Sequence, residues 1–372
     1  MTHLNFKNKQ TFLSVFFLLF IGISSVWAQE RVRPKEYTSI REIVQDETLR
    51  NDFLLQGEYL CDIEGTRVGL QLIADGNGKF RCVFYYDGLP GAGWYTGDVR
   101  FLGTAVIEGE NGFRFEITKV DSKDQIDGLP ELPFKFDGTW QLNLSQRQQG
   151  QGMDGIAVIK TKILEWNATF SKTQRRSPTF DAKAPEGAVV IFDGTHVNMF
   201  EPGAKINEVQ RAPGNTLWAE ATTKPFEQRP YTLHLEFMLS YMPTARGQDR
   251  SNSGVYIDQA YECQVLDSYG LELANNHCGG FYQAKAPSIN MCFPPLTWQT
   301  YDFVFTPPKY NGKTKVENAR ITVRHNGVTI HNNIELLKET PGQKSEANEP
   351  RGIFLQGHGN KVQYRNIWLK YN

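Results

Sequence analysis

The residues best suited to chemistry lie in a stretch that reads as a β-hairpin, residues 246–267. Two apolar strand-like runs are joined by a tight turn, and carboxylate, amide and guanidinium side chains interrupt them. Such groups are too many for a hairpin in an ordinary core, because an unpaired polar group costs free energy in apolar surroundings. We therefore predict that this hairpin forms one wall of a ligand-binding cleft.

Strand alternation sorts these side chains by face. Side chains two apart on a strand share a face, so Glu262 and Gln264 point the same way. Asp267, at the end of the run, can turn to the rim. In the later stretch GIFLQGHG, Gln356 and His358 share a face with each other. As a hypothesis, we place both polar lines on the ligand-binding sheet, with Gln356 and His358 as the wall opposite Glu262.

Two residues are candidates for moving a proton. A glutamate inside an apolar strand is costly unless it is paired or functional, which makes Glu262 the leading candidate. His358 lies between two glycines, where the backbone approaches something closely, and is the second. Asp267 is the nearest further carboxylate. Each of the three could instead serve only the structure, as an ion pair or a solvated side chain.

Further polar and aromatic side chains could contact a ligand. Arg246 and Asn252 belong to the polar part of the hairpin, and Arg365 lies in the last strand-like run. Tyr256 and Tyr282 could stack on the flat face of a sugar ring. The structural alternatives are a solvated loop arginine for Arg246 and a purely structural arginine at position 365.

Composition excludes one class of partner and favours another. The 372 residues carry a formal net charge of −1 without a Lys/Arg run, which argues against a nucleic-acid partner. Aromatic residues make up 12% of the chain, and its 33 glycines and 18 prolines suit many turns. This composition is typical of an all-β protein, and it also suits a carbohydrate ligand.

Residues 1–28 have the features of a secretory signal peptide. A weakly basic start precedes the apolar run 12–23, and Val26 and Ala28 fit a small-residue cleavage site. The run is too short to span a bilayer comfortably, and no later stretch is apolar enough to cross one. We expect cleavage after Ala28 and a periplasmic or secreted protein without a membrane span; an uncleaved anchor is the alternative.

Five cysteines in an exported chain predict two disulfides and one remaining thiol. Proximity in the sequence pairs Cys61 with Cys82 and Cys278 with Cys292. Each bond would close a short loop, and a loop of ~15 residues contributes roughly 3 kcal/mol in the chain-entropy model. Cys263 lies inside an apolar strand pattern and is predicted to be a buried free thiol.

Most of the chain alternates with the period of a β-strand, between glycine-rich turns. Residues 29–170 read as a small antiparallel β domain with an Asp-Gly-Asn-Gly hairpin, after a start that could form a short helix. Residues 171–186 are a polar, proline-bearing linker. Residues 187–372 predict a two-sheet antiparallel sandwich. The fold class is therefore all-β, with a C-terminal jelly-roll β-sandwich after a smaller antiparallel β domain.

The second half also carries a series of motifs in a familiar order: FDGT, LHLEF, NSGVYI, YECQVLDS, CGGFYQAKAPSINMCFPPLTWQTYDFVF, ARITVRHNGVTIH, GIFLQGHG and VQYRNIWLK. On these motifs, residues 187–372 resemble the 3-keto-disaccharide hydrolase domain family. The resemblance implies a concanavalin A-like jelly roll that acts on glycosides oxidised at C3. The first half resembles an N-terminal β module of some exported members. GQDRSNSGVY has polar residues where close relatives often have glycine.

Such a substrate would react at C2, whose hydrogen is acidic beside the C3 ketone. A general base removes this proton, the enolate expels the group at C1 by β-elimination, and water adds to the enone. The route needs a base, an electrophile for the C3 oxygen and an acid for the leaving oxygen. Glu262 or His358 could be the base, and Arg246, Arg365 or a divalent metal could hold the enolate oxygen. No HxH or HExxH spacing supports a metal.

Two alternatives remain open beside this leading hypothesis. The protein could be a non-catalytic, lectin-like binder of oligosaccharides or glycosides. It could also be a conventional glycoside hydrolase, which needs two carboxylates about 5–9.5 Å apart. Glu262 and Asp267 are the candidates for that pair, but alternation puts them on opposite faces unless a bulge intervenes.

Overall fold

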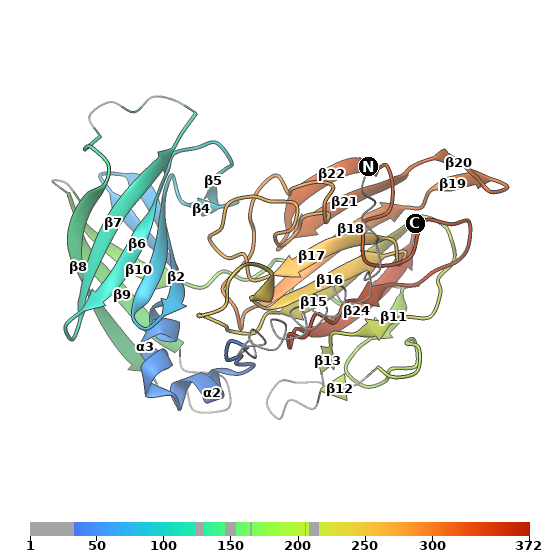
Figure 1. Ribbon diagram of the computed structural model, residues 1–372, viewed down its shortest axis with the longest axis horizontal. Helices are drawn as coiled ribbons and strands as arrows, with labels where there is room; N and C mark the ends of the chain where they lie inside the picture. The colour runs from blue at the N-terminus through green and yellow to red at the C-terminus, as the bar shows by residue number, and fades with distance from the viewer. Residues whose placement is uncertain are drawn as a thin grey trace, which may run out of the picture. The chain divides into compact units, whose positions relative to one another are not determined.

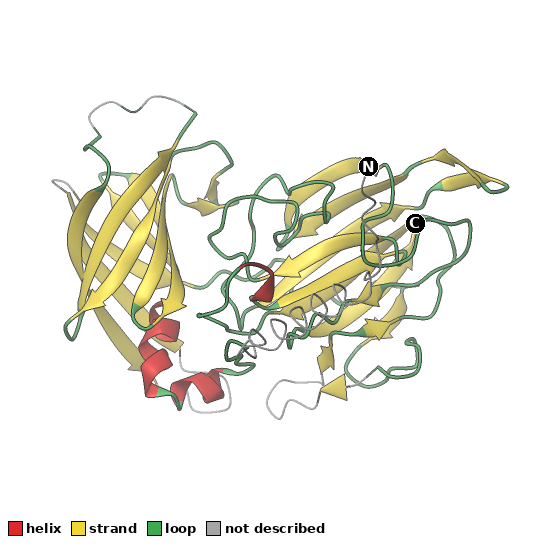
Figure 2. Cartoon of the chain, viewed as in Figure 1, coloured by secondary structure: helices red, strands yellow, loops and turns green. Residues whose placement is uncertain are grey.

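A computed structural model describes residues 33–123, 126, 129–145, 154–163, 166–204, 206–207 and 216–372. The predicted signal peptide lies outside the described residues. The fold below belongs to the compact unit formed by residues 36–372. Its regular structure is almost entirely strand, as Figure 2 shows, and the predicted all-β class is confirmed. Within the described ranges, no helix has the length and apolar character needed to cross a membrane.

Two short helices precede the first strand, where the sequence predicted one. They are α2 (Ile40–Val44) and α3 (Glu47–Leu55). Ser39 caps α2, because its side chain accepts a hydrogen bond from the Glu42 N–H, and the Glu42 carboxylate accepts one from the Ser39 hydroxyl at 3.0 Å. Ile43 and Leu55 are fully buried, so the helices are held to the fold by their apolar side chains.

The first β domain is a closed antiparallel barrel, which is more specific than the sequence predicted (Figure 1). Asn77 and Gly78 take positive φ angles of 57° and 69° in the predicted Asp-Gly-Asn-Gly hairpin. Aromatic side chains such as Phe84 and Phe115 are buried in its core. In barrel order, the strands are β1 (Gly57–Ile63), β10 (Trp166–Thr173), β9 (Asp154–Ile163), β8 (Phe134–Ser145), β7 (Gly112–Asp121), β6 (Arg100–Glu108), β3 (Lys79–Tyr86) and β2 (Thr66–Gly76).

The second domain is a sandwich of two antiparallel sheets, as predicted. The smaller sheet has the order β14 (Ala221–Thr222), β23 (Phe354–Leu355), β16 (Asn252–Ile257) and β17 (Tyr261–Leu266). The larger sheet has the order β12 (Ile206–Asn207), β13 (Thr216–Trp218), β24 (Gln363–Tyr371), β15 (Tyr231–Met238), β18 (Trp298–Thr306), β21 (Ala319–His325) and β22 (Val328–Leu336), and β11 (Val189–Phe192) also pairs with β24. The described residues also form two short strand pairs, β4 (Leu89–Pro90) with β5 (Gly93–Trp94) and β19 (Lys309–Asn311) with β20 (Thr314–Glu317), and the 3-10 helix η1 (Gly247–Asp249).

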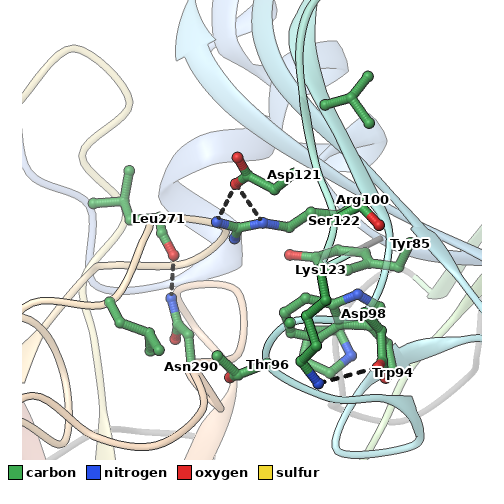
Figure 3. Close-up of a pocket in the computed structure, with 14 residues that line it drawn as sticks. Tyr85, Trp94, Thr96, Asp98, Arg100, Asp121, Ser122, Lys123, Leu271 and Asn290 are labelled. Carbon is green, nitrogen blue, oxygen red and sulfur yellow. Dashed lines mark hydrogen bonds and ion pairs between the residues drawn. The ribbon is translucent and has the colours of Figure 1, made fainter. Parts of the chain in front are cut away.

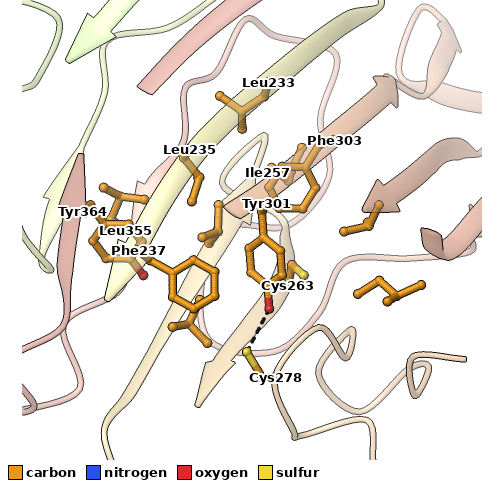
Figure 4. Close-up of a cluster of buried hydrophobic side chains, with 14 of the residues drawn as sticks. Leu233, Leu235, Phe237, Ile257, Cys263, Cys278, Tyr301, Phe303, Leu355 and Tyr364 are labelled. Atoms are coloured by element: carbon orange, nitrogen blue, oxygen red, sulfur yellow. Dashed lines mark hydrogen bonds between the residues drawn. The ribbon is translucent and has the colours of Figure 1, made fainter. Parts of the chain in front are cut away.

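The sandwich core is built from alternate side chains of both sheets (Figure 4). Leu235 and Phe237 of β15 and Tyr301 of β18 meet Val255 and Cys263 of the smaller sheet, all with no measurable exposure. Full burial of each large apolar side chain contributes about 1.5–3 kcal/mol. Because successive side chains on a strand alternate, this core leaves the other face of the smaller sheet to polar residues.

The predicted linker is held to the larger sheet by side chains rather than solvated. Thr179 donates a hydrogen bond to Asp302 at 2.7 Å, and the Asp181 N–H donates to the fully buried Glu236 at 2.6 Å. Arg175 pairs with the buried Glu58 of the barrel at 2.6 Å. The first residues assigned to the linker belong to β10, which ends at Thr173.

The predicted bond between Cys61 and Cys82 is wrong. The five cysteines all lie within the described ranges, and each is a buried free thiol. Cys61 is on β1 and Cys82 on β3, with β2 between them. Two strand spacings of about 4.8 Å separate their backbones by roughly 10 Å, beyond the ~7 Å that a disulfide can bridge. The predicted burial of the Cys263 thiol is confirmed, with no measurable exposure.

Cys278 and Cys292 are also free thiols, but they are neighbours. Their thiols are close enough to interact electrostatically, and the Cys278 sulfur lies 3.1 Å from the Tyr301 hydroxyl. Both residues are buried beneath the sheets. The disulfide between Cys278 and Cys292 therefore stays a prediction. Their positions in the structure are compatible with it.

Thiol mapping distinguishes the two pairs. When the protein is unfolded and alkylated without reductant, Cys61 and Cys82 should both be modified, because strand β2 lies between their strands and keeps them apart. Peptide mass mapping gives the measurement, and a sample reduced before alkylation gives the reference. A linked peptide joining Cys61 to Cys82 would contradict the strand order of the barrel.

Candidate functional site

The register of β16 and β17 puts four of the site positions on one sheet face. Tyr256 pairs with Glu262, and Gly254 pairs with Gln264. Paired residues of an antiparallel ladder share a face, and the intervening Val255 and its partner Cys263 belong to the core. The prediction that Glu262 and Gln264 point the same way is therefore confirmed. This face lies opposite the core.

Glu262 is a buried carboxyl held by a phenol. Its Oε2 accepts a hydrogen bond from the Tyr256 hydroxyl at 2.8 Å, and the residue is 3% exposed. The carboxyl lies over Gly254, where a Cβ would come within 2.3 Å of Oε1. Burial raises the pKa of Glu262 to about 7, and the hydrogen bond from Tyr256 offsets part of that rise. Glu262 can thus exchange a proton near neutral pH.

Gln356 reaches the same face from the neighbouring strand. Its N–H donates to the Gly254 carbonyl at 2.8 Å, next to the pairing of Phe354 with Tyr256. Its Nε2 lies 3.5 Å from the Tyr256 hydroxyl, and its Oε1 is buried without a hydrogen-bond partner in the described structure. Gln356 is therefore beside Glu262 on one sheet, and the expectation of an opposite wall is wrong.

We call this surface the Glu262 face. It comprises Asn252, Gly254, Tyr256, Glu262, Gln264, Phe354 and Gln356.

Asn252 and Gln264 extend the face as a mutually bonded pair. Gln264 Nε2 donates to Asn252 Oδ1 at 2.7 Å and to the Ser253 carbonyl at 2.9 Å. Asn252 in turn donates to the Gln248 carbonyl at 2.9 Å. Both residues are almost fully buried. Contact with a substrate stays a prediction for them, and their present partners fix their orientation.

Tyr282 and His358 lie at the margins of the face. The Tyr282 N–H donates to the Glu262 carbonyl at 3.3 Å, so this half-buried tyrosine flanks the edge of β17. His358 follows Gln356 in an exposed segment after β23. No contact described in the structure links its imidazole to Glu262, and its role as a base stays a prediction.

Asp267 has a structural partner instead of a catalytic one. Its Oδ2 lies 2.6 Å from Arg250 Nε, and both side chains are 3% exposed or less. A strand advances about 3.3 Å per residue, which separates Glu262 from Asp267 by roughly 16 Å. Hydrolysis by two carboxylates needs about 5–9.5 Å between them. The geometry does not support Asp267 as the partner of Glu262.

The two predicted arginines are held elsewhere. Arg365, on the larger sheet, binds Glu236 at 2.8 Å and Asp181 at 2.7 Å. Arg246 donates to the Pro243 carbonyl at 2.6 Å and lies 3.3 Å from Asp75 of the barrel. The prediction that either arginine holds an oxygen of the ligand at Glu262 is therefore not supported by their positions.

Sequence reasoning missed two contributions to the site. Tyr256 was assigned to sugar stacking, but its hydroxyl bonds Glu262 and lies 3.0 Å from the Pro341 carbonyl. Gly254 makes room for the carboxyl. An isolated glycine within a strand pattern signals a close approach of another group, and this signal was present in NSGVYI. In the part of the chain that the structure describes, no cluster of three His, Cys, Asp or Glu residues could hold a metal.

Residues 165–370 match the family described as the 3-keto-alpha-glucoside-1,2-lyase-like domain. The chain belongs to this family. The match begins one residue before β10 and covers the sandwich up to the penultimate residue of β24, which confirms the resemblance found in the sequence. The family supports a glycoside-acting enzyme or binder.

Solved structures give more distant likenesses. A protein of Parabacteroides distasonis ATCC 8503, described as a candidate glycosyl hydrolase, is 26% identical over 51% of this chain and 85% of its own, with a TM-score of 0.44. A second such protein of the same organism is 14% identical over 50% and 94%, with a TM-score of 0.37. A Trypanosoma rangeli sialidase is 9% identical over 84% and 60%, with a TM-score of 0.28. No curated protein matches the chain.

Removing Asp267 should lower the free energy of unfolding, because its role is structural. Asp267→Ala removes the short ion pair of the buried Arg250 and leaves only Asp75, at 3.8 Å, opposite its charge. Breaking a buried pair of this kind costs up to about 3–5 kcal/mol. Urea unfolding measures the change. The matched control is Asp137→Ala, which breaks an exposed pair with Arg114 and should change stability little. Equal stability of the two variants would contradict a structural role for Asp267.

The raised pKa of Glu262 also has a consequence for stability. The folded protein keeps a proton on Glu262 that the unfolded chain releases between the ordinary pKa of 4.5 and about 7. The free energy of unfolding therefore falls as pH rises through this window. Glu262→Gln should reduce the fall by on the order of 3 kcal/mol, because each pKa unit corresponds to about 1.4 kcal/mol.

Chemical denaturation of wild type and Glu262→Gln at the two ends of this window gives the measurement. A fall that remains in the variant belongs to other buried acids, such as Asp258, whose pKa burial raises to about 7. If the free energy of unfolding changed with pH equally in wild type and variant, Glu262 would have no raised pKa.

Proposed function

We propose that the sandwich domain cleaves 3-keto-glycosides by elimination across C1 and C2, with Glu262 as the proton-transferring group. The observation that carries the proposal is a buried carboxyl with a pKa of about 7 on a polar sheet face. The family description, a 1,2-lyase-like domain for 3-keto-alpha-glucosides, supports the same substrate class. With Asp267 held elsewhere, a route that needs only one carboxylate fits better than one that needs two.

In the first step, Glu262 acts as a base. A base works best when its pKa lies near the working pH, because it is then both ionised and strong enough to take a proton. The carboxylate takes the C2 proton, and the C2–H electrons become the enolate. Tyr256, whose pKa burial raises, stays protonated and holds Oε2. Oε1, over Gly254, is left to receive the proton.

In the second step, the enolate electrons form the C1–C2 double bond, and the C1–O bond breaks toward the leaving oxygen. The protonated Glu262 returns its proton to that oxygen, so one residue serves first as base and then as acid. The products are an enone and a free alcohol. Addition of water to the enone then gives net hydrolysis, and an enzyme that released the enone unchanged would be a lyase.

Gln356 is suited to hold the sugar. Its amide can donate to the developing charge on the C3 oxygen, since its contact with Tyr256 at 3.5 Å is long for a hydrogen bond. Its buried Oε1, without a partner in the described structure, can accept a bond from a sugar hydroxyl. An amide thus takes the place of the arginines that the sequence suggested. A divalent metal remains an alternative for this role.

Access to Glu262 requires a movement of the segment that covers it. Tyr256 is 1% exposed, and a Cβ at Gly342 would lie 2.5 Å from its hydroxyl, so this segment packs on the phenol. Thr340 accepts a hydrogen bond from the Glu262 N–H at 2.7 Å. We propose that residues 340–342 open for the substrate and close over it, which would keep water from the enolate. We also propose that the chain is exported, on the signal-like residues 1–28.

The deciding assay compares a 3-keto-disaccharide with the unoxidised sugar, with and without a chelator. Wild type should cleave only the oxidised sugar, and Glu262→Gln should lose about 100-fold or more in turnover, as is typical for a general base. The matched control is Glu346→Gln. Glu346 also accepts a bond from a tyrosine, Tyr261, at 2.5 Å but lies outside the Glu262 face, so its variant should remain active.

Other outcomes would refute the proposal in different ways. Full activity of Glu262→Gln would remove the residue from the mechanism. Cleavage of the unoxidised sugar alone would indicate a conventional glycoside hydrolase. Binding of either sugar without cleavage would indicate a lectin-like protein. In the active enzyme, kcat/KM should rise with pH through about 7 as Glu262 loses its proton.

A further inference from the structure

A cavity of about 340 Å³ opens where three barrel segments meet a loop of the sandwich (Figure 3). The barrel contributes Trp94 at the end of β5, Arg100 at the start of β6 and the segment after β7. The loop contributes Leu271 and Asn290. No residue of the Glu262 face lines this cavity. Ligand sites of small molecules begin at about 300 Å³, so the space suits one or two sugar rings.

The inner wall of the cavity is held by an ion pair, a hydrogen bond and ring contacts. Arg100 binds Asp121 Oδ2 through two nitrogens, at 3.1 and 2.8 Å, and its guanidinium lies 5.7 Å from the Trp94 ring centre. The Trp94 and Tyr85 rings pack edge to face with centres 4.9 Å apart. Trp94 also donates to the Val99 carbonyl at 3.1 Å. An aromatic edge and a fixed ion pair therefore lie side by side before any ligand binds.

The outer rim carries a second, looser ion pair. Lys123 Nζ lies 3.9 Å from Asp98 Oδ1, and their side chains are 65% and 41% exposed. The stem of Lys123 packs over Gly97, where a Cβ would come within 1.9 Å of its Cε. Figure 3 shows the ammonium of Lys123 extending toward Asp98 beside Trp94. Because this ion pair is long and exposed, Lys123 and Asp98 can each exchange their mutual contact for a hydrogen bond to a ligand.

The charges of the lining cancel. Arg100 and Lys123 are matched by Asp121 and Asp98, so the cavity offers neither an anion nor a cation a net attraction. Its carboxylates can accept hydrogen bonds and its cationic side chains can donate them, and both kinds of group lie beside aromatic rings. Vicinal hydroxyls on a ring with an apolar C–H face have the complementary arrangement. The chemistry therefore favours a neutral sugar over a charged metabolite.

We propose that this cavity is a second carbohydrate site, which holds a neutral sugar ring alone or as the end of an oligosaccharide. Lys123 and Asp98 bond its hydroxyls at the rim, and the Arg100–Asp121 pair and Trp94 form the inner wall. The site is independent of the chemistry proposed at Glu262. It would give the barrel domain a role in holding saccharide near an enzyme that acts on saccharides.

Binding is tested on the full chain that carries Glu262→Gln, so that no probe is consumed. Maltose, cellobiose and sucrose are titrated by calorimetry and saturation-transfer NMR, with glucuronate as the charged comparison. At least one neutral disaccharide should bind saturably. Adding Lys123→Ala or Asp98→Ala should weaken it about tenfold, the loss expected for a hydrogen bond to a charged group. Both residues are exposed enough for the variants to fold.

The matched control is Lys135→Ala, which removes an exposed lysine of the barrel that does not line the cavity. It should leave the affinity unchanged. The proposal is overturned if no neutral disaccharide binds, if glucuronate binds more tightly than all three, or if Lys123→Ala and Asp98→Ala bind as the control does. Cleavage of the 3-keto substrate is measured separately, so failure of either proposal leaves the other testable.

Discussion

The apolar face of the hairpin β16–β17 must lie against the larger sheet, and this requirement decides where its polar side chains point. Val255 and Cys263 fill the core, so their neighbours Tyr256 and Glu262 are forced to the opposite face. The register between the strands then sets the phenol beside the carboxyl. The position of Glu262 on one face of the sheet is thus set by the packing of apolar side chains on the opposite face.

The buried acids of this protein fall into two kinds. Glu58, Glu236 and Asp267 each have an arginine partner, at 2.6 to 2.8 Å. Two of these pairs, those of Glu58 and Glu236, join segments more than a hundred residues apart in the sequence. Glu262 instead receives a hydrogen bond from a neutral hydroxyl, which leaves desolvation as the larger effect on its pKa. The contrast separates acids that hold the fold together from acids that can exchange a proton, and Glu262 is of the second kind.

The sequence was sufficient for features that depend on near neighbours. Alternation predicted the shared face of Glu262 and Gln264, and the Asp-Gly-Asn-Gly turn predicted the β2–β3 hairpin. Features that depend on distant segments were not predictable. The position of Gln356 beside Gly254 requires the pairing of β23 with β16, about a hundred residues apart in the chain.

Two of the errors have the same origin. Asp267 reads as a free carboxylate until the burial of Arg250 is known. Cys61 and Cys82 read as partners until β2 is found between their strands. In both cases the local sequence permits the assignment. Burial with a charged partner excludes it for Asp267, and the order of the strands excludes it for the two cysteines. Strand order follows from long-range pairing, which a single sequence without repeats does not reveal.

Both domains close by pairing their first strand with their last. β1 pairs with β10, with Glu58 opposite Thr173, and β11 pairs with β24, with Val189 opposite Leu369. Such long-range contacts slow folding, because the chain between them must be ordered before they form. During synthesis, neither domain could complete its sheet until its last strand had emerged. Until then each would expose an unpaired strand edge, the kind of surface on which chains associate with one another.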